Sequence, residues 1–216
     1  MPGMLFHFVF SNYVYDEVLS KIKDKDKFFL GSIMPDYCIN KDKSHYREKE
    51  SFSGFEVPNL NKAKKDLLDS NDSYLLGIYS HIFLDYYFIK EIISKKYTLN
   101  ADQGIVLEKN TNKTYDISKF YARPYEGGIL YRGYSELNHL FISNNLIKVD
   151  YLLSLPNDFI MPNNINFYGL KKANWKEELK WYLSGESKYT GYPFEFKEVA
   201  NELISLKNLF IYELEF

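Results

Sequence analysis

The chain has 216 residues, a length that fits one domain and can bury a hydrophobic core without disulfide or metal staples. Hydrophobic residues make up 45% and charged residues 26%, as in ordinary globular proteins. The net charge of −2 lacks the basic excess of a nucleic-acid-binding protein. Nucleic acid is therefore not expected as a partner, whereas a small phosphorylated substrate is compatible with this charge.

Apolar residues at helical spacing, together with helix-capping and helix-breaking residues, predict the elements in chain order. The predicted helices are 12–22, 25–34, 60–68, about 72–95, 135–146, 149–155, 175–184 and 195–214. Ser11, Asn59 and Asn174 are candidate N-caps. Pro35 and Pro156 end the helices before them, because the residue preceding a proline disfavours the helical conformation.

Three stretches are expected to be largely non-helical. Residues 38–58 are interpreted as loop with one short helical piece near His45, and residues 156–170 as loop. In residues 97–130, glycines and polar turn residues break the helical period, and 105–113 fits a small hairpin. The predicted fold is therefore all-α: one domain over 1–216, a helical bundle around a buried metal site with an irregular insertion.

The lone cysteine, Cys38, excludes an intramolecular disulfide and is expected to be a small buried hydrophobic residue, with metal binding as the alternative. The first residues lack the basic and apolar regions of a signal peptide. The apolar run 74–89 is shorter than the roughly 20 residues of a membrane span and contains charged and polar residues. We expect a cytoplasmic protein without a transmembrane segment, and the sequence carries no indication of its oligomeric state.

His81 and Asp85 lie four residues apart on the long apolar helix, so both side chains point to one face. A helix that is apolar nearly all round is buried on every side. A buried carboxylate is costly unless it is paired, hydrogen-bonded or coordinated. The pair is therefore a candidate metal site, with a hydrogen-bonded core pair as the alternative. Gly77, one turn earlier on the same face, would leave room for an ion or a substrate.

Four further residues are candidates that would each be interpreted as structural if seen alone. Pro35 fixes the backbone before Asp36, so this carboxylate can point inward from the end of an apolar helix. The alternative is a common Pro-Asp turn. His45 follows in a loop, His7 lies in an apolar N-terminal stretch, and His139 lies on an amphipathic helix.

Taken in order, these features resemble the zinc-dependent phospholipase C family, whose fold is shared with the fungal single-strand nucleases. They are a His after Met-Pro-Gly, a helix ending in Gly-x-x-x-Pro-Asp, a loop His, a His-x-x-x-Asp helix preceded by Gly, and a later helical His. The resemblance covers 1–95 well and 96–147 weakly, and it is not visible in 148–216. It implies a helical bundle that holds up to three zinc ions and cleaves phosphodiesters.

The resemblance also implies the ligands. Asp36, His45, His81 and Asp85 correspond to the ligands of one zinc ion, with Asp36 also in a catalytic role beside the attacking water. His7 corresponds to a ligand of a second zinc ion, which shares the carboxylate of Asp85.

A third zinc site is expected to be degraded. His139 corresponds to one of its ligands, but Ser143 stands where the family has a glutamate. Glu91 and Glu136 lie near the expected places without matching the motif. The resemblance thus implies one firm zinc site and a possible second.

Three functions follow from these residues. In the first, zinc makes hydroxide available near neutral pH to attack the phosphorus of a small phosphodiester or phospholipid-like substrate. Arg123 and Arg132 are then candidates to hold the phosphate, with exposed surface arginines as the alternative. The second is a non-catalytic, metal-stabilised protein of the same family, which the serine at position 143 favours. The third is a metal-free helical interaction module.

Overall fold

The computed structural model describes residues 3–68, 72–159, 169–170, 174–184 and 190–215. Its helices are, in chain order, α1 Met4–Tyr15, α2 Lys25–Ile33, α3 Lys41–Ser44, α4 Leu60–Leu68, α5 Ser73–Phe88, α6 Ser94–Lys96, α7 Ile117–Phe120, α8 Ile129–Ser143, α9 Val149–Ser154, α10 Trp175–Ser184 and α11 Phe196–Glu215. A 3₁₀ turn, Met34–Tyr37, follows α2, and a π-helical turn, Ile89–Ile93, joins α5 to α6.

Two small antiparallel sheets make the all-α prediction wrong, because the fold mixes helices with strands. The strands are β1 Arg47–Phe52 with β2 Phe55–Pro58 in one sheet, and β3 Tyr97–Asn100, β4 Ile105–Glu108 and β5 Lys113–Asp116 in the other. The first sheet lies in a stretch predicted as loop, whereas β4 and β5 correspond to the predicted hairpin. The backbone N–H of Leu99 donates to the carbonyl oxygen of Ser53 at 2.8 Å, which ties the two sheets together.

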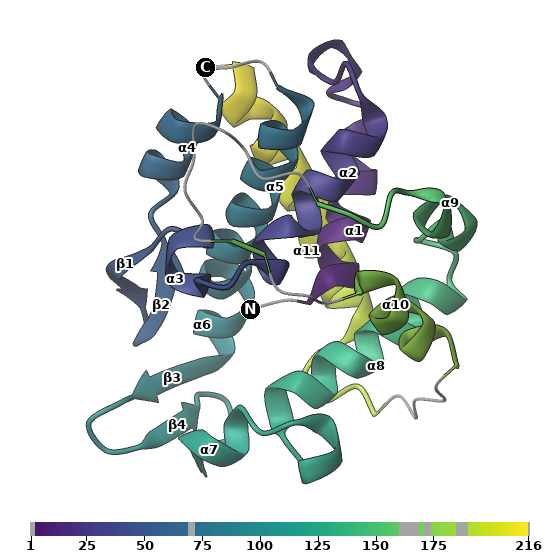
Figure 1. Cartoon of the computed structure of the whole chain (residues 1–216). Coiled ribbons are helices and arrows are strands. Elements are labelled where there is room, and N and C mark those ends of the chain that lie inside the picture. Colours follow the sequence, from purple (N-terminus) through teal and green to yellow (C-terminus); the bar gives the residue numbers. More distant parts are fainter. Residues whose placement is uncertain (1–2, 69–71, 160–168, 171–173, 185–189, 216) are drawn as a thin grey trace.

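The core is built around α5, with α1, α2 and α11 packed against it (Figure 1). One aromatic ring from each of three helices meets at its centre: Phe10 of α1, Phe83 of α5 and Phe210 of α11. Their ring centroids lie 5.0 to 5.8 Å apart. Both α1 and α5 are buried on almost every side, which confirms the burial predicted for α5.

Most helix boundaries agree with the sequence prediction. Asp72 caps α5, accepting a hydrogen bond from the backbone N–H of Tyr74 at 2.7 Å. Helix α8 begins at Ile129, ahead of the predicted start at 135, and the first helix differs most, since α1 begins at Met4 and ends at Tyr15. It is apolar all round and begins after a glycine without a side-chain cap, so neither periodicity nor capping marks its start. Most of the predicted loop 156–170 lies outside the described residues.

The closest approach of α2 and α5 occurs at two glycines. A Cβ at Gly77 would overlap the carbonyl oxygen of Phe28, and a Cβ at Gly31 would overlap that of Tyr74. The backbones of the two helices are therefore in direct contact one turn before His81. The prediction that Gly77 leaves room for an ion or a substrate is wrong, because the backbone of α2 fills that space.

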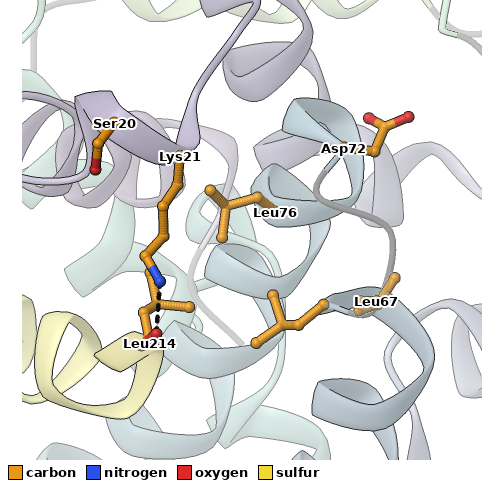
Figure 2. A pocket seen from close by; sticks show the side chains of 7 residues that line it. Ser20, Lys21, Leu67, Asp72, Leu76 and Leu214 are labelled. Atoms are coloured by element: carbon orange, nitrogen blue, oxygen red, sulfur yellow. Dashed lines mark hydrogen bonds between the residues drawn. The ribbon is translucent and has the colours of Figure 1, made fainter. Parts of the chain in front are cut away.

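A pocket of about 380 Å³ lies at the N-terminal end of α5, between α4 and the end of α11. Figure 2 shows Lys21 reaching across it to donate a hydrogen bond to the carbonyl oxygen of Leu214 at 2.6 Å. The pocket contains none of the candidate site residues. The hydrogen bond from Lys21 to Leu214 links α11 to the segment that follows α1.

In the described part of the chain, no helix combines the length and the apolarity needed to cross a membrane. The cytoplasmic location stays a prediction.

Candidate metal centre

His81 and Asp85 lie in the second half of α5, at 1% and 0% exposure. The Nε2 atom of His81 is 3.4 Å from Oδ2 of Asp85. The prediction that this pair shares one buried helix face is confirmed.

The orientation of the His81 ring is fixed from outside its helix. Its Nδ1 atom lies 2.7 Å from the carbonyl oxygen of Ser32 in α2. Because a carbonyl oxygen can only accept, Nδ1 carries the proton and donates. The glycine contact of α2 with α5 brings Ser32 to this position. The Nε2 atom therefore faces the buried cluster, in the arrangement by which proteins orient metal-binding histidines.

His45 reaches the same place from the end of α3, and it is completely buried. Its Nδ1 atom lies 3.0 Å from the carbonyl oxygen of Lys41, so Nδ1 again donates. The hydroxyl of Ser44, 2.9 Å from the same nitrogen, donates to the carbonyl oxygen of Pro35 at 3.0 Å. The Nε2 atom of His45 lies 3.2 Å from Nε2 of His81.

The spacing of these atoms fits a tetrahedral cation. Ligand nitrogens about 2.0–2.1 Å from a tetrahedral zinc lie about 3.3–3.4 Å apart. The corresponding distances here are 3.2 Å between the two Nε2 atoms and 3.4 Å from His81 Nε2 to Asp85 Oδ2. The distance from His45 Nε2 to Asp85 Oδ2 is 3.8 Å. A proton between the two imidazoles is the alternative, but burial lowers the pKa of His45 and disfavours its protonated form.

Asp36 provides a further oxygen from the 3₁₀ turn after α2, where Pro35 occupies an early position. Its Oδ1 atom lies 3.5 Å from Nε2 of His45 and 2.9 Å from Nζ of Lys41. Burial would raise the pKa of Asp36, but Lys41 and His45 outweigh it and hold the pKa well below its ordinary value. The predicted inward direction of this carboxylate is confirmed.

Asp85 and His7 are buried polar groups without ordinary hydrogen bonds to described residues. The ring of His7, in α1, stacks on that of His81 with centroids 3.5 Å apart. Its Nε2 atom lies 3.6 Å from Oδ1 of Asp85. Buried polar atoms are almost always satisfied, so these atoms, gathered at one point, are suited to hold an ion.

The charges in the cluster favour a cation. Burial and the neighbouring His81 lower the pKa of His7 to about 3, so this imidazole is neutral at pH 7. Burial would raise the pKa of Asp85, but the surrounding histidines His81, His7 and His45 lower it to about 2. The carboxylate is therefore ionised at pH 7. Divalent cations match such a set of anionic oxygens and neutral nitrogens.

The five side chains form two overlapping groups that are close enough to hold metal ions: His45, His81 and Asp85 in one, and His7, Asp36 and His81 in the other. Asp85 lies between them, with Oδ2 facing His45 and His81 and Oδ1 facing His7. A carboxylate in this position can bridge two cations. The ligand set implied for the first zinc is brought together, and His7 is beside it.

His139 lies outside both groups. It is half-buried in α8, with its ring 6.3 Å from that of Tyr182. Ser143 is exposed, and Glu91 pairs with Lys95 at 2.8 Å. Glu136 accepts hydrogen bonds from the backbone N–H and the hydroxyl of Thr190. None of the residues considered for a third zinc therefore joins a ligand group in the described part of the chain.

An aromatic pocket of about 800 Å³ adjoins the centre. Most of its lining comes from α8, α10 and the segment before α8: Tyr121, Arg123, Pro124, Tyr125, Tyr131, Tyr134, Ser135, Asn138, His139, Glu178, Trp181 and Tyr182, together with Gly3. Asn138 is 1% exposed, and neither polar atom of its side chain has an ordinary hydrogen bond to a described residue. The sequence analysis missed this wall, since its aromatic residues do not stand out in a chain with 18% aromatics.

Neighbours of two candidate ligands contact the pocket wall. The hydroxyl of Tyr37, which follows Asp36, donates to Glu178 at 2.6 Å, and the ring of Phe6, which precedes His7, lies 5.5 Å from that of Tyr134. Burial raises the pKa of Tyr131, and the carboxylate of Asp36 raises it further. Burial and neighbouring tyrosines hold the pKa of Tyr134 well above its ordinary value, and Asp85 adds to this effect. The aromatic wall therefore lies near the candidate ligands, although none of the five lines the pocket.

The two arginines predicted to hold phosphate lie in different surroundings. Arg123 lies on the pocket wall, whereas Nε of Arg132 lies 3.7 Å from Glu136 and outside the lining. Lys41, which the sequence analysis did not single out, is the cation in contact with Asp36. Cys38 is buried beside the sulfur of Met34 and belongs to neither ligand group.

Comparison of the chain with protein-family models, with curated proteins and with solved structures finds no match. The resemblance seen in the sequence therefore stays a prediction, and the assignment of function depends on the geometry of the site.

Proposed function

We propose that this protein is a metal-dependent phosphodiester hydrolase of the zinc-dependent phospholipase C type. The supporting observation is the pair of Nε2 atoms of His45 and His81, fixed 3.2 Å apart beside the unpaired carboxylate of Asp85. Imidazole and carboxylate groups are typical zinc ligands, and catalysis would require a water molecule in addition to the four side chains.

Four residues would hold the first zinc ion: Asp36, His45, His81 and Asp85. His7 would hold a second ion with the other oxygen of Asp85. Bound zinc supplies hydroxide near neutral pH and polarises the phosphoryl oxygens. The protein supplies ligand orientation through the carbonyl oxygens of Ser32 and Lys41, which hold the two imidazoles in one tautomer.

Asp36 is the candidate catalytic residue. Its side chain is 23% exposed, whereas that of Asp85 is fully buried, so Asp36 lies on the solvent side of the cluster. Its low pKa keeps it ionised, and an ionised carboxylate accepts a hydrogen bond from an attacking water and orients it.

The aromatic pocket is where we place the organic part of the substrate. Its volume of about 800 Å³ suits a small ligand, and apolar walls with few polar groups are typical of ligand pockets. The proposed substrate is a small phosphodiester or phospholipid-like molecule. Its phosphorus would lie at the metal centre and its apolar or planar part between Tyr131 and Tyr182.

Elemental analysis of the purified protein for zinc, manganese, iron and nickel tests the metal. We expect at least one zinc ion per chain, which His81→Ala loses and the matched control His139→Ala retains. His139 is suitable because it lies outside both ligand groups. Absence of metal from the wild type after reloading with zinc, or full zinc content in His81→Ala, would contradict the proposal.

Hydrolysis of bis(p-nitrophenyl) phosphate by the zinc-loaded protein tests the activity, with His81→Ala expected to be inactive.

A second candidate function is a non-catalytic, metal-stabilised protein. It is favoured by the exposed Ser143 and by the engagement of Glu91 and Glu136 with other partners. Zinc binding without hydrolysis of this or other diesters would select that candidate.

A further inference from the structure

Lys41 is a cation at the border between the centre and solvent. It begins α3, a single turn that is capped by Asn40, whose side chain accepts from the backbone N–H of Lys43 at 3.0 Å. The ammonium lies 2.9 Å from Oδ1 of Asp36 and also donates to the backbone carbonyl oxygen of that residue. The Lys41 side chain is 32% exposed, so it is partly accessible to solvent.

The Oδ1 atom of Asp36 is shared by two groups. It faces the ammonium of Lys41 at 2.9 Å and Nε2 of His45 at 3.5 Å. A metal ion held by Asp36 and His45 would take charge density from this oxygen and weaken its attraction for the ammonium. The lysine stem is flexible, so the ammonium can move a short distance to another anion.

The other nearby cations are engaged elsewhere. Arg47 pairs with Asp42 at 3.4 Å, and Arg123 donates to the hydroxyl of Tyr125 at 3.2 Å. Among the residues that the structure describes, Lys41 is the lysine or arginine that forms an ion pair with a member of the two ligand groups, namely Asp36.

We propose that Lys41 is a substrate-binding residue that holds a non-bridging oxygen of an anionic phosphate ester. This inference rests on the proposed function, since the phosphate reaches Lys41 only when it lies at the metal centre. In the metal-loaded protein the ammonium passes from Asp36 to the phosphoryl oxygen, without any change in covalent bonds. Lys41 thereby selects anionic phosphodiesters over neutral phosphotriesters of the same size.

Binding of inorganic phosphate to the zinc-loaded protein, measured by calorimetry, tests this role. Lys41→Gln removes the charge while keeping a polar side chain, and Lys41→Arg keeps the charge. Lys43→Gln is the matched control, because Lys43 is an exposed lysine of the same turn. We expect Lys41→Gln to weaken phosphate binding about tenfold, the usual effect of one charge-assisted hydrogen bond. Lys41→Arg should recover part of it, and Lys43→Gln should match the wild type.

Zinc content and affinity, measured on the same samples, separate this role from a structural one. Removing a cation from beside Asp36 leaves zinc binding unchanged or tighter, so Lys41→Gln is expected to retain zinc. With bis(p-nitrophenyl) phosphate, its KM should rise about tenfold with a smaller change in kcat.

Three results would overturn the role of Lys41 while leaving the metal centre standing: wild-type phosphate affinity in Lys41→Gln, an equal loss in Lys43→Gln, or loss of zinc from Lys41→Gln alone. A wild type that binds no zinc, or a zinc-loaded wild type that binds no phosphate, would overturn the proposed function and this inference together.

Discussion

Replacing Gly77 by alanine tests whether the contact between α2 and α5 sets the metal centre. The added Cβ would overlap the carbonyl oxygen of Phe28 and lie 2.9 Å from the backbone nitrogen of Ser32. Both are backbone atoms, so neither can rotate away and the two helices must separate. Separation would also lengthen the 2.7 Å hydrogen bond from His81 to Ser32.

Opposing effects determine how much Gly77→Ala changes the free energy of unfolding. Alanine in place of glycine favours an exposed helix by about 1 kcal/mol. Overpacking a core costs about 1–3 kcal/mol, and a lost hydrogen bond about 1 kcal/mol more. We therefore expect Gly77→Ala to lower the free energy of unfolding by about 1–3 kcal/mol. Because His81 loses its orienting partner, zinc affinity should fall about 10- to 100-fold.

Urea unfolding of the zinc-free protein and competitive zinc titration of the folded protein measure the two effects. Gly3→Ala is the control, because a Cβ there has no neighbouring atom within contact distance. If Gly77→Ala were as stable as the wild type and bound zinc equally well, the helix contact would not be what positions His81.

Two further predictions concern protonation and the pocket. The pKa of His7 lies at about 3 in the folded protein against about 6.5 unfolded, so the unfolded chain binds the extra proton and stability falls as pH decreases through this window. Between pH 7 and pH 5 the zinc-free wild type should lose about 2 kcal/mol more than His7→Gln in urea unfolding, and equal losses would contradict a buried neutral His7. Tyr131→Ala should raise KM for an aryl phosphodiester about three- to tenfold without loss of zinc, and an unchanged KM would remove Tyr131 from the substrate pocket.

Local patterns indicated His81, Asp85 and Asp36 as candidate ligands, whereas His7 and His45 were added through the resemblance. The spacing of His81 and Asp85 places both on one face of a helix whose apolar residues require burial. Pro35 marks the turn that presents Asp36. His139 was grouped with them through the resemblance alone, and it lies on the pocket wall, outside both ligand groups.

The strands were harder to predict because few of their side chains enter the core. In β1 the residues are mostly polar and show no apolar alternation, so the sequence favoured loop. The sequence signal for the turn between β1 and β2 is Ser53-Gly54, a turn pair whose φ angles of 49° and 83° both lie in the left-handed region. Tyr97–Asn100 was not assigned to a strand, since its conformation depends on pairing with β4, the next strand along the chain.

Some contacts were outside the reach of sequence reasoning. Lys41 follows Asp36 by five residues, and the conformation of the turn between them, which no sequence pattern indicated, brings its ammonium to that carboxylate. Likewise, the filled space beside Gly77 depends on the backbone of α2.

The candidate metal ligands occur between His7 and Asp85, whereas the aromatic wall, apart from Gly3, is contributed by residues 121–182. In the proposed hydrolase, the candidate metal ligands and the wall that would hold the organic part of the substrate thus come from separate stretches of one chain. Substitutions in the second stretch can change which molecule is accepted while the ion-binding residues stay untouched. Such a division allows related chains to diverge in substrate without rebuilding their reactive centre.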